Sequence, residues 1–170
     1  GKIAAALEVY VSADRLAQRI STAPTDTADY DDWLRGESLL LRWTPEADKE
    51  AKDLFTRIIS RTPEFAPAYA SLASIHNVRH ILFPGSTPNT EDAKAARISA
   101  ALAVELDPMD ARNHLALAWS AALTGGFDQA GVHLDLALSL NPDSPTTTIS
   151  AAMGYAFLGD HLRASQVLDA

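Results

Sequence analysis

The fold is decided by residues 111–142, which read ARNHLALAWSAALTGGFDQAGVHLDLALSLNP. Two runs rich in alanine and leucine are joined there by Gly125-Gly126, and the second run closes on Asn141-Pro142. The same kind of punctuation, Asp107-Pro108, stands 34 residues earlier. Glycine and proline interrupt helices, and a fixed interval of this length is typical of stacked helix–turn–helix units. The stretch therefore predicts one antiparallel helix pair of a repeat protein.

Small and large residues occupy regular positions inside this unit. If Ala111 is position 1, Leu117 and Leu134 stand at positions 7 and 24. The residues at positions 8, 20 and 27 are Ala118, Ala130 and Ala137. Small side chains let paired helices approach closely, and the leucines fill the remaining space. With Gly125 at position 15 and Pro142 at position 32, the pattern resembles the tetratricopeptide repeat. The resemblance implies an all-α, right-handed superhelical α-solenoid of antiparallel helix pairs.

The repeat register extends over most of the chain. We expect repeats over about 28–63, 66–108, 111–142 and 145–170, the last one truncated, after an N-terminal helix and linker over 1–27. Pro63 lies 45 rather than 34 residues before Pro108, so the 11 extra residues are expected as an inserted surface loop at 80–90. About eight or nine helices are predicted, over 2–20, 28–43, 45–61, 66–79, 91–106, 110–123, 127–140, 145–158 and 161–170. The truncated last repeat predicts that the chain is a piece of a longer protein.

Composition excludes several classes of function. The net charge of −8, from 14 basic and 22 acidic residues, opposes direct contact with nucleic acid. The chain has no cysteine, which excludes disulfides and thiolate metal sites. Its apolar runs are too short to cross a bilayer, so no membrane contact is expected from this segment. A cytoplasmic location is the resulting expectation.

Residues that could carry catalysis are few. His76 and His80 are spaced i, i+4, as metal ligands on a helix are, but no glutamate completes a His-Glu-x-x-His pattern. Packing or exposure accounts for His114, His133 and His161 at their repeat positions. No nucleophile elbow, phosphate loop or dinucleotide motif occurs. We expect no enzyme activity, cofactor or metal site; a helical enzyme that uses His76 or His80 with a carboxylate is the alternative.

A narrower resemblance lies in the first half of the chain. The segments Tyr30–Gly36, Thr44-Pro45 and Thr62–Ala73 are similar to the C-terminal repeat region of bacterial winged-helix transcriptional regulators and class III adenylate cyclases. The resemblance implies a non-enzymatic module for protein–protein interaction, or a regulatory scaffold, within a larger bacterial signalling or transcription regulator. An intramolecular regulatory domain or a homodimerisation domain is the alternative.

The tetratricopeptide resemblance also implies which residues line the concave face of the superhelix. Positions 2, 5, 9 and 12 of each first helix hold Pro67, Ala70, Ser74, Asn77, Arg112, Leu115, Trp119, Ala122, Thr146, Ile149, Met153 and Ala156. The expected partner groove consists of Ser74, Asn77, Arg112, Leu115, Trp119, Ile149 and Met153.

This set is mostly apolar and carries one cation. It lacks the lysine and asparagine cluster with which some members of the family clamp a peptide carboxylate. We therefore expect Trp119, Ile149 and Met153 to hold an apolar helix or an extended peptide. The chain's own first helix, a second copy of the protein, or no ligand at all are the alternatives for this face.

Overall fold

The computed structural model describes the backbone of residues 27–82 and 90–169, together with their side chains except those of 78–82 and 90. This part of the chain forms eight α-helices and no strand. The helices are α2 (Thr27–Leu40), α3 (Pro45–Arg61), α4 (Ala66–Leu82), α5 (Thr90–Leu106), α6 (Ala111–Leu123), α7 (Phe127–Leu140), α8 (Pro145–Phe157) and α9 (His161–Asp169). The helix expected over 2–20 and most of the expected inserted loop lie outside the described residues.

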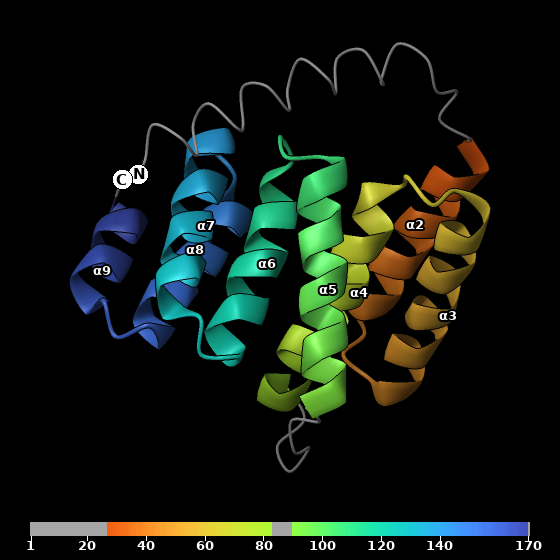
Figure 1. Ribbon diagram of the computed structural model, residues 1–170, viewed down its shortest axis with the longest axis horizontal. Coiled ribbons are helices and arrows are strands. Elements are labelled where there is room, and N and C mark those ends of the chain that lie inside the picture. Colours follow the sequence, from red (N-terminus) through yellow and green to blue (C-terminus); the bar gives the residue numbers. More distant parts are fainter. Residues whose placement is uncertain (1–26, 83–89, 170) are drawn as a thin grey trace.

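The helices stack as four antiparallel pairs in chain order (Figure 1). The pairs are α2 with α3, α4 with α5, α6 with α7, and α8 with α9. The first helix of each pair also packs on the preceding pair, so that α6 contacts α4 and α5, and α8 contacts α6 and α7. This arrangement confirms the predicted α-solenoid.

Small residues form the close contacts within and between the pairs. Ala118, Ala130 and Ala137, predicted to sit at helix crossings, are each at most 1% exposed. Leu134 is also buried, and a Cβ atom added to Gly154 of α8 would stand only 2.8 Å from its Cδ1 atom. The alternation of small and large side chains therefore sets the spacing between α7 and α8, as interior packing requires.

The turns and caps follow from local sequence. Gly125 and Gly159 both adopt a φ of +82°, a left-handed conformation that favours glycine, at equivalent turns of successive repeats. At the start of α3 the Thr44 hydroxyl accepts a hydrogen bond from the Ala47 amide at 3.2 Å, and Pro45 occupies the first turn. Threonine is a favoured N-cap residue and proline a favoured first residue of a helix, so this cap follows from the local sequence.

Two helix ends lie three residues away from the expected positions, and the other described ends lie within one residue. The second predicted helix stops at Leu40 rather than at 43, because the amides of Arg42 and Trp43 turn back onto Leu39 and Leu40 and Trp43 takes a φ of 53°. The helix predicted to stop at 79 continues to Leu82, and the next begins at Thr90. Part of the range expected as an inserted loop is therefore helical.

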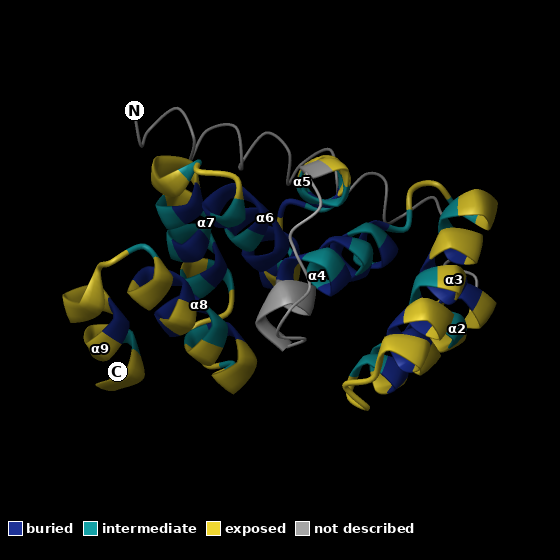
Figure 2. Cartoon of the chain, turned by 90° about the horizontal axis from the view of Figure 1, so that it is seen from below, coloured by how far each residue is buried: buried dark blue, intermediate teal, exposed yellow. Residues whose placement is uncertain are grey.

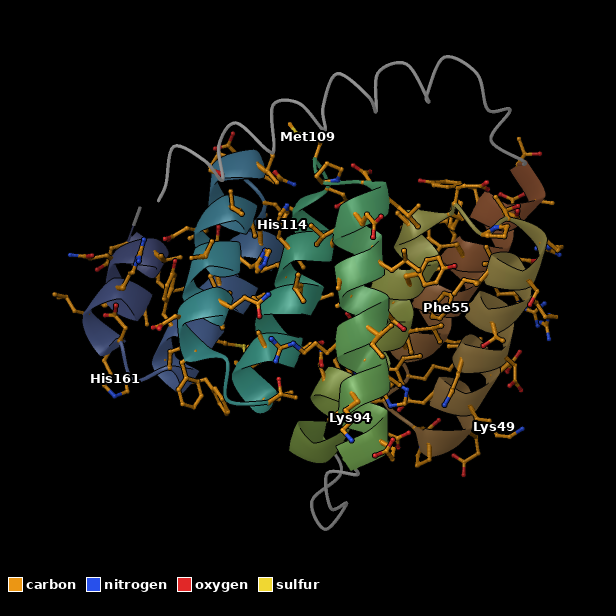
Figure 3. The ribbon with its side chains drawn as sticks, in the orientation of Figure 1. Lys49, Phe55, Lys94, Met109, His114 and His161 are labelled. Carbon is orange, nitrogen blue, oxygen red and sulfur yellow. The ribbon has the colours of Figure 1, made fainter. Side chains whose placement is uncertain are left out.

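The pairs follow an arc when the chain is seen from below (Figure 2), with α4 and α6 in the middle and α2–α3 and α8–α9 at its two ends. Buried residues lie mainly between helices, while exposed ones cover the outer surfaces. Lys49 and Lys94 extend outward from α3 and α5, whereas Phe55 lies inside (Figure 3). The first helices of the four pairs are thereby left to form the inner surface of the arc.

Candidate functional site

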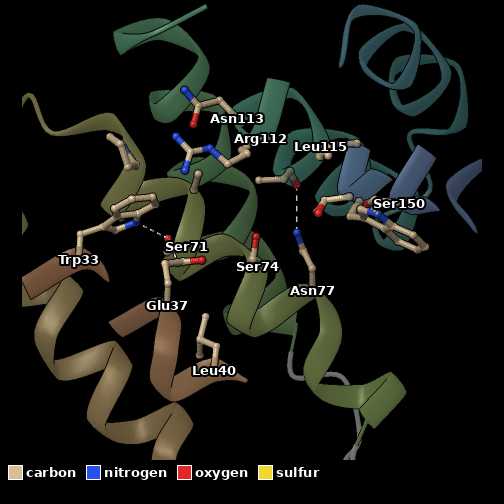
Figure 4. A pocket seen from close by; sticks show the side chains of 15 residues that line it. Trp33, Glu37, Leu40, Ser71, Ser74, Asn77, Arg112, Asn113, Leu115 and Ser150 are labelled. Carbon is tan, nitrogen blue, oxygen red and sulfur yellow. Dashed lines mark hydrogen bonds between the residues drawn. The ribbon is translucent and has the colours of Figure 1, made fainter. Parts of the chain in front are cut away.

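A groove with a cavity volume of about 250 Å³ runs along the inner surface of the arc. Its walls come from the first helix of every pair, α2, α4, α6 and α8 (Figure 4). Residues far apart in the sequence, from Trp33 to Ser150, therefore face one space. Most of the exposed surface of this lining is apolar, as is typical of ligand and peptide sites, although eight of its fifteen residues are polar or charged.

The structure brings together most of the expected groove residues. Ser74, Asn77, Arg112, Leu115 and Trp119 all line the cavity. Pro67, Ala70 and Thr146 line it as well.

The expected residues of the last repeat lie differently. Ile149 and Met153 are exposed on α8, next to the lining residue Ser150 along the helix but outside the cavity wall. Ala122 is buried in the core, and Ala156 is exposed outside the cavity.

Several lining residues were not among those expected. Trp33 and Leu40 of α2 stand 34 residues before Pro67 and Ser74, so the repeat register could have found them. Position 6 of every first helix also faces the groove, where the residues are Glu37, Ser71, Ala116 and Ser150. The rule that uses positions 2, 5, 9 and 12 misses these four residues, and with them the one carboxylate among the described lining residues.

At the α2 end, hydrogen bonds hold a tryptophan and a glutamate in place. Trp33 Nε1 donates to Ser71 Oγ at 3.0 Å, and the Ser71 hydroxyl donates to Glu37 Oε1 at 2.5 Å. The guanidinium of Arg112 lies 4.8 Å from the Trp33 ring centroid, within the range of a cation–π contact. Arg112 also donates from Nε to Asp110 Oδ1 at 3.0 Å and from Nη2 to Asp110 Oδ2 at 2.5 Å. This hydrogen bonding raises the pKa of Arg112.

At the α8 end a second indole is held in the same way. Trp119 Nε1 donates to Ser150 Oγ at 3.1 Å, and its ring packs against Phe157 with centroids 5.8 Å apart. Between the two indoles, Asn77 Nδ2 donates to the Ala116 carbonyl at 2.9 Å. The groove thus has two indoles whose orientations are set before any partner arrives.

A pair of histidines lies away from the groove, between α6 and α7. The rings of His114 and His133 stack with centroids 5.2 Å apart, and their Nδ1 atoms are 2.9 Å apart. His114 Nε2 donates to the Pro108 carbonyl at 2.9 Å, so His114 Nδ1 must accept from His133 Nδ1–H. Burial lowers the pKa of His114, and it lowers that of His133 to about 4.

The remaining histidines lie on other helices of the solenoid. His76 is half-buried on α4, His161 is exposed, and the side chain of His80 lies outside the described residues. Over 27–77 and 91–169, no three histidine or carboxylate side chains come together as metal ligands would. In the same described part of the chain, no helix has the length and apolar character needed to span a membrane.

Comparison with known proteins relates the chain to repeat proteins by structure. No family model and no curated protein matches it. Among solved structures it is similar to TTC0263, a thermophilic tetratricopeptide repeat protein of Thermus thermophilus, with a TM-score of 0.68 and 19% identity over 98% of this chain and 82% of that one. It is also similar to MamA, with a TM-score of 0.55 and 16% identity over 91% of this chain and 81% of that one. The chain therefore has the tetratricopeptide repeat fold, and the groove lies on its inner face.

Proposed function

We propose that this chain is a non-enzymatic protein-interaction module that holds a protein or peptide partner in the groove. The observation that carries the proposal is the partly exposed indole of Trp119, fixed by Ser150 in the groove wall, with the buried indole of Trp33 fixed by Ser71 at the other end. Tryptophans in desolvated pockets contribute a large share of the binding energy at protein interfaces. Because their rotamers are fixed beforehand, less side-chain entropy is lost on binding.

The surrounding surface supports an extended contact. Met153 and Phe157 of α8 are each about half exposed, at 53% and 51%, on the helix that supplies Ser150. Met153 lies three residues after Ser150 and hence on the same helical face. A partner that covers Trp119 can therefore reach this apolar stripe as well.

The wider role that we propose is that of a scaffold or regulatory module in a larger bacterial signalling or transcription regulator, acting in the cytoplasm. It is supported by the resemblance of Tyr30–Gly36 and Thr62–Ala73 to the repeat regions of such proteins. The net charge of −8 favours a protein partner over nucleic acid.

Site-specific photo-crosslinking in the cells from which the gene comes tests this function. A photoreactive phenylalanine analogue replaces Met153 beside the groove, and in a matched control it replaces Ile98, which is 69% exposed on α5. We expect an adduct with a foreign protein from position 153 and not from position 98.

Other outcomes decide between the alternatives. An adduct of twice the mass of the chain would support homodimerisation through the same face. Equal labelling from both positions, or none from position 153, would contradict the proposal.

A further inference from the structure

Several hydrogen-bond donors of the groove are already used within the protein. Both indole N–H groups donate to serines, Trp33 to Ser71 and Trp119 to Ser150. The Ser71 hydroxyl in turn donates to Glu37. None of these groups has a second proton to offer a ligand.

The amide donors are used in the same way. Asn77 Nδ2 donates to the Ala116 carbonyl, and Asn113 Nδ2 donates to the carbonyls of Ala103 and Asp107 at 3.1 and 2.8 Å. The two indoles and these two amides therefore already have acceptors within the protein.

Two acceptors, by contrast, are left without donors. Among the described residues Glu37 accepts one hydrogen bond, from Ser71 to Oε1, and forms no ion pair, so Oε2 remains available at the half-exposed side chain. Asn113 Oδ1 also has no hydrogen-bond partner within the described part of the chain, but Asn113 is 0% exposed, so a ligand in the groove does not reach this atom. The free oxygen of Glu37 is complementary to a ligand that donates.

The charges around the groove also favour a ligand that carries a positive charge. Arg112 is the cation of the cavity wall, but Asp110 binds it through two parallel hydrogen bonds, which neutralises its charge locally. Glu37 also lies in the field of Arg112, but Asp110 is the carboxylate that binds this cation, so the three groups together carry a net negative charge. The whole chain, at −8, adds a field of the same sign.

We propose that the groove selects a partner segment carrying a lysine or arginine, whose cationic group binds Glu37 while neighbouring apolar side chains cover Leu40 and Trp119. This inference rests on the proposed function and specifies the chemistry of its partner. A lysine or arginine side chain only donates and carries the opposite charge, so it matches the free Glu37 oxygen, which repels a peptide carboxylate.

Selection of displayed peptides with random sequences of about 12 residues, long enough to span several repeats, tests the inference. The baits are the whole chain, Glu37→Gln, Glu37→Lys, and the control Glu105→Lys, which makes the same charge change at an exposed residue of α5 outside the groove. Glutamine keeps an acceptor for Ser71, so Glu37→Gln removes the charge with little effect on the fold. Thermal melting of each bait verifies folding.

We expect the wild-type bait to enrich peptides with a lysine or arginine beside apolar residues. Synthetic copies of these peptides should bind Glu37→Gln about 10- to 100-fold more weakly, the usual effect of losing a charged hydrogen bond. Replacing the peptide's cation by glutamine should give the same loss. Glu37→Lys should enrich acidic peptides instead, and Glu105→Lys should enrich the same peptides as the wild type.

Different failures have different meanings. Peptides that require Trp119 but bind Glu37→Gln as tightly as the wild type would overturn this inference and leave the proposed function standing. Enrichment for a free C-terminal carboxylate would overturn it in the same way. A dimer of the chain that dissociates on Glu37→Lys would assign the groove to a second copy and contradict a foreign partner. No enrichment from any bait would count against both proposals.

Discussion

Gly36 of α2 stands directly against the ring of Phe55 of α3, so close that a Cβ atom at position 36 would lie 2.3 Å from Phe55 Cε1. Phe55 is fully buried in the core between α2, α3 and α4, and its ring cannot move without disturbing that packing. Gly36→Ala should therefore lower the free energy of unfolding by about 1–3 kcal/mol through overpacking, although alanine favours the helix. Chemical denaturation measures this change.

The matched control is Gly131→Ala on α7, where an added Cβ meets no atom within 4 Å. That variant should gain about 0.5–1 kcal/mol of stability from helix propensity alone. Equal effects at the two positions would show that Gly36 and Phe55 are not in this contact.

A buried carboxylate joins α2 to the end of α3. Asp29 is 1% exposed, and its side chain accepts hydrogen bonds from Thr62 and, at 2.5 Å, from Arg61. Asp29→Ala leaves these donors without their acceptor, so it should destabilise the protein by about 1–3 kcal/mol. Its neighbour Asp31 is exposed, and Asp31→Ala should stay within about 0.5 kcal/mol of the wild type. Thermal unfolding of both variants measures their stability. Equal losses of stability in Asp29→Ala and Asp31→Ala would contradict this prediction.

Stability should fall in mild acid because of the stacked histidines. The pKa of His133 is about 4 in the folded protein, held down mainly by burial and then by His114. The unfolded chain takes up this proton near its ordinary pKa of about 6.5, so below that pH it binds more protons than the folded chain. The stability present above pH 6.5 is therefore lost progressively as the pH falls toward about 4.

The variant His133→Phe removes the titrating group while retaining an aromatic ring against His114. Its unfolding free energy should depend less on pH between 6.5 and about 4 than that of the wild type. Parallel slopes for the two proteins in this interval would rule out His133 as the cause.

The orientation of an indole should matter to binding as much as its presence. Ser150 accepts the Trp119 N–H, and Ser150→Ala removes that acceptor while leaving the ring in place. Peptides selected on the groove should bind this variant about 3- to 10-fold more weakly, because ring freedom must be lost on binding. Isothermal titration calorimetry of the wild type and the variant at the same temperature measures this difference. An unchanged affinity of the peptide for the variant would mean that the indole needs no support from Ser150.

The sequence predicted the helices well because their ends are marked by local chemistry. Gly125 supplies a left-handed turn and Thr44 caps a helix, and both signals lie within a few residues of the boundary that they define. The end at Leu40 was missed because Trp43 adopts a positive φ, which a bulky residue rarely does.

Contacts between neighbouring repeats were harder to predict. The bonds that link Trp33 and Glu37 to Ser71 span 38 and 34 residues and depend on how α2 crosses α4. His114 and His133 were each assigned to packing or exposure alone, whereas the structure stacks them across α6 and α7. A repeat register indicates which face a residue occupies, but the angle between adjacent helices decides which partner it meets.

The most direct test of the central claim, that the inner groove is a binding surface built around fixed indoles, is the affinity of one selected peptide for the wild type and for Trp119→Ala. Binding should weaken at least about tenfold, a typical loss at an interface hot spot, while the variant still unfolds cooperatively and keeps its oligomeric state. Equal affinity of the two proteins, or a change of oligomeric state in the variant, would contradict the account.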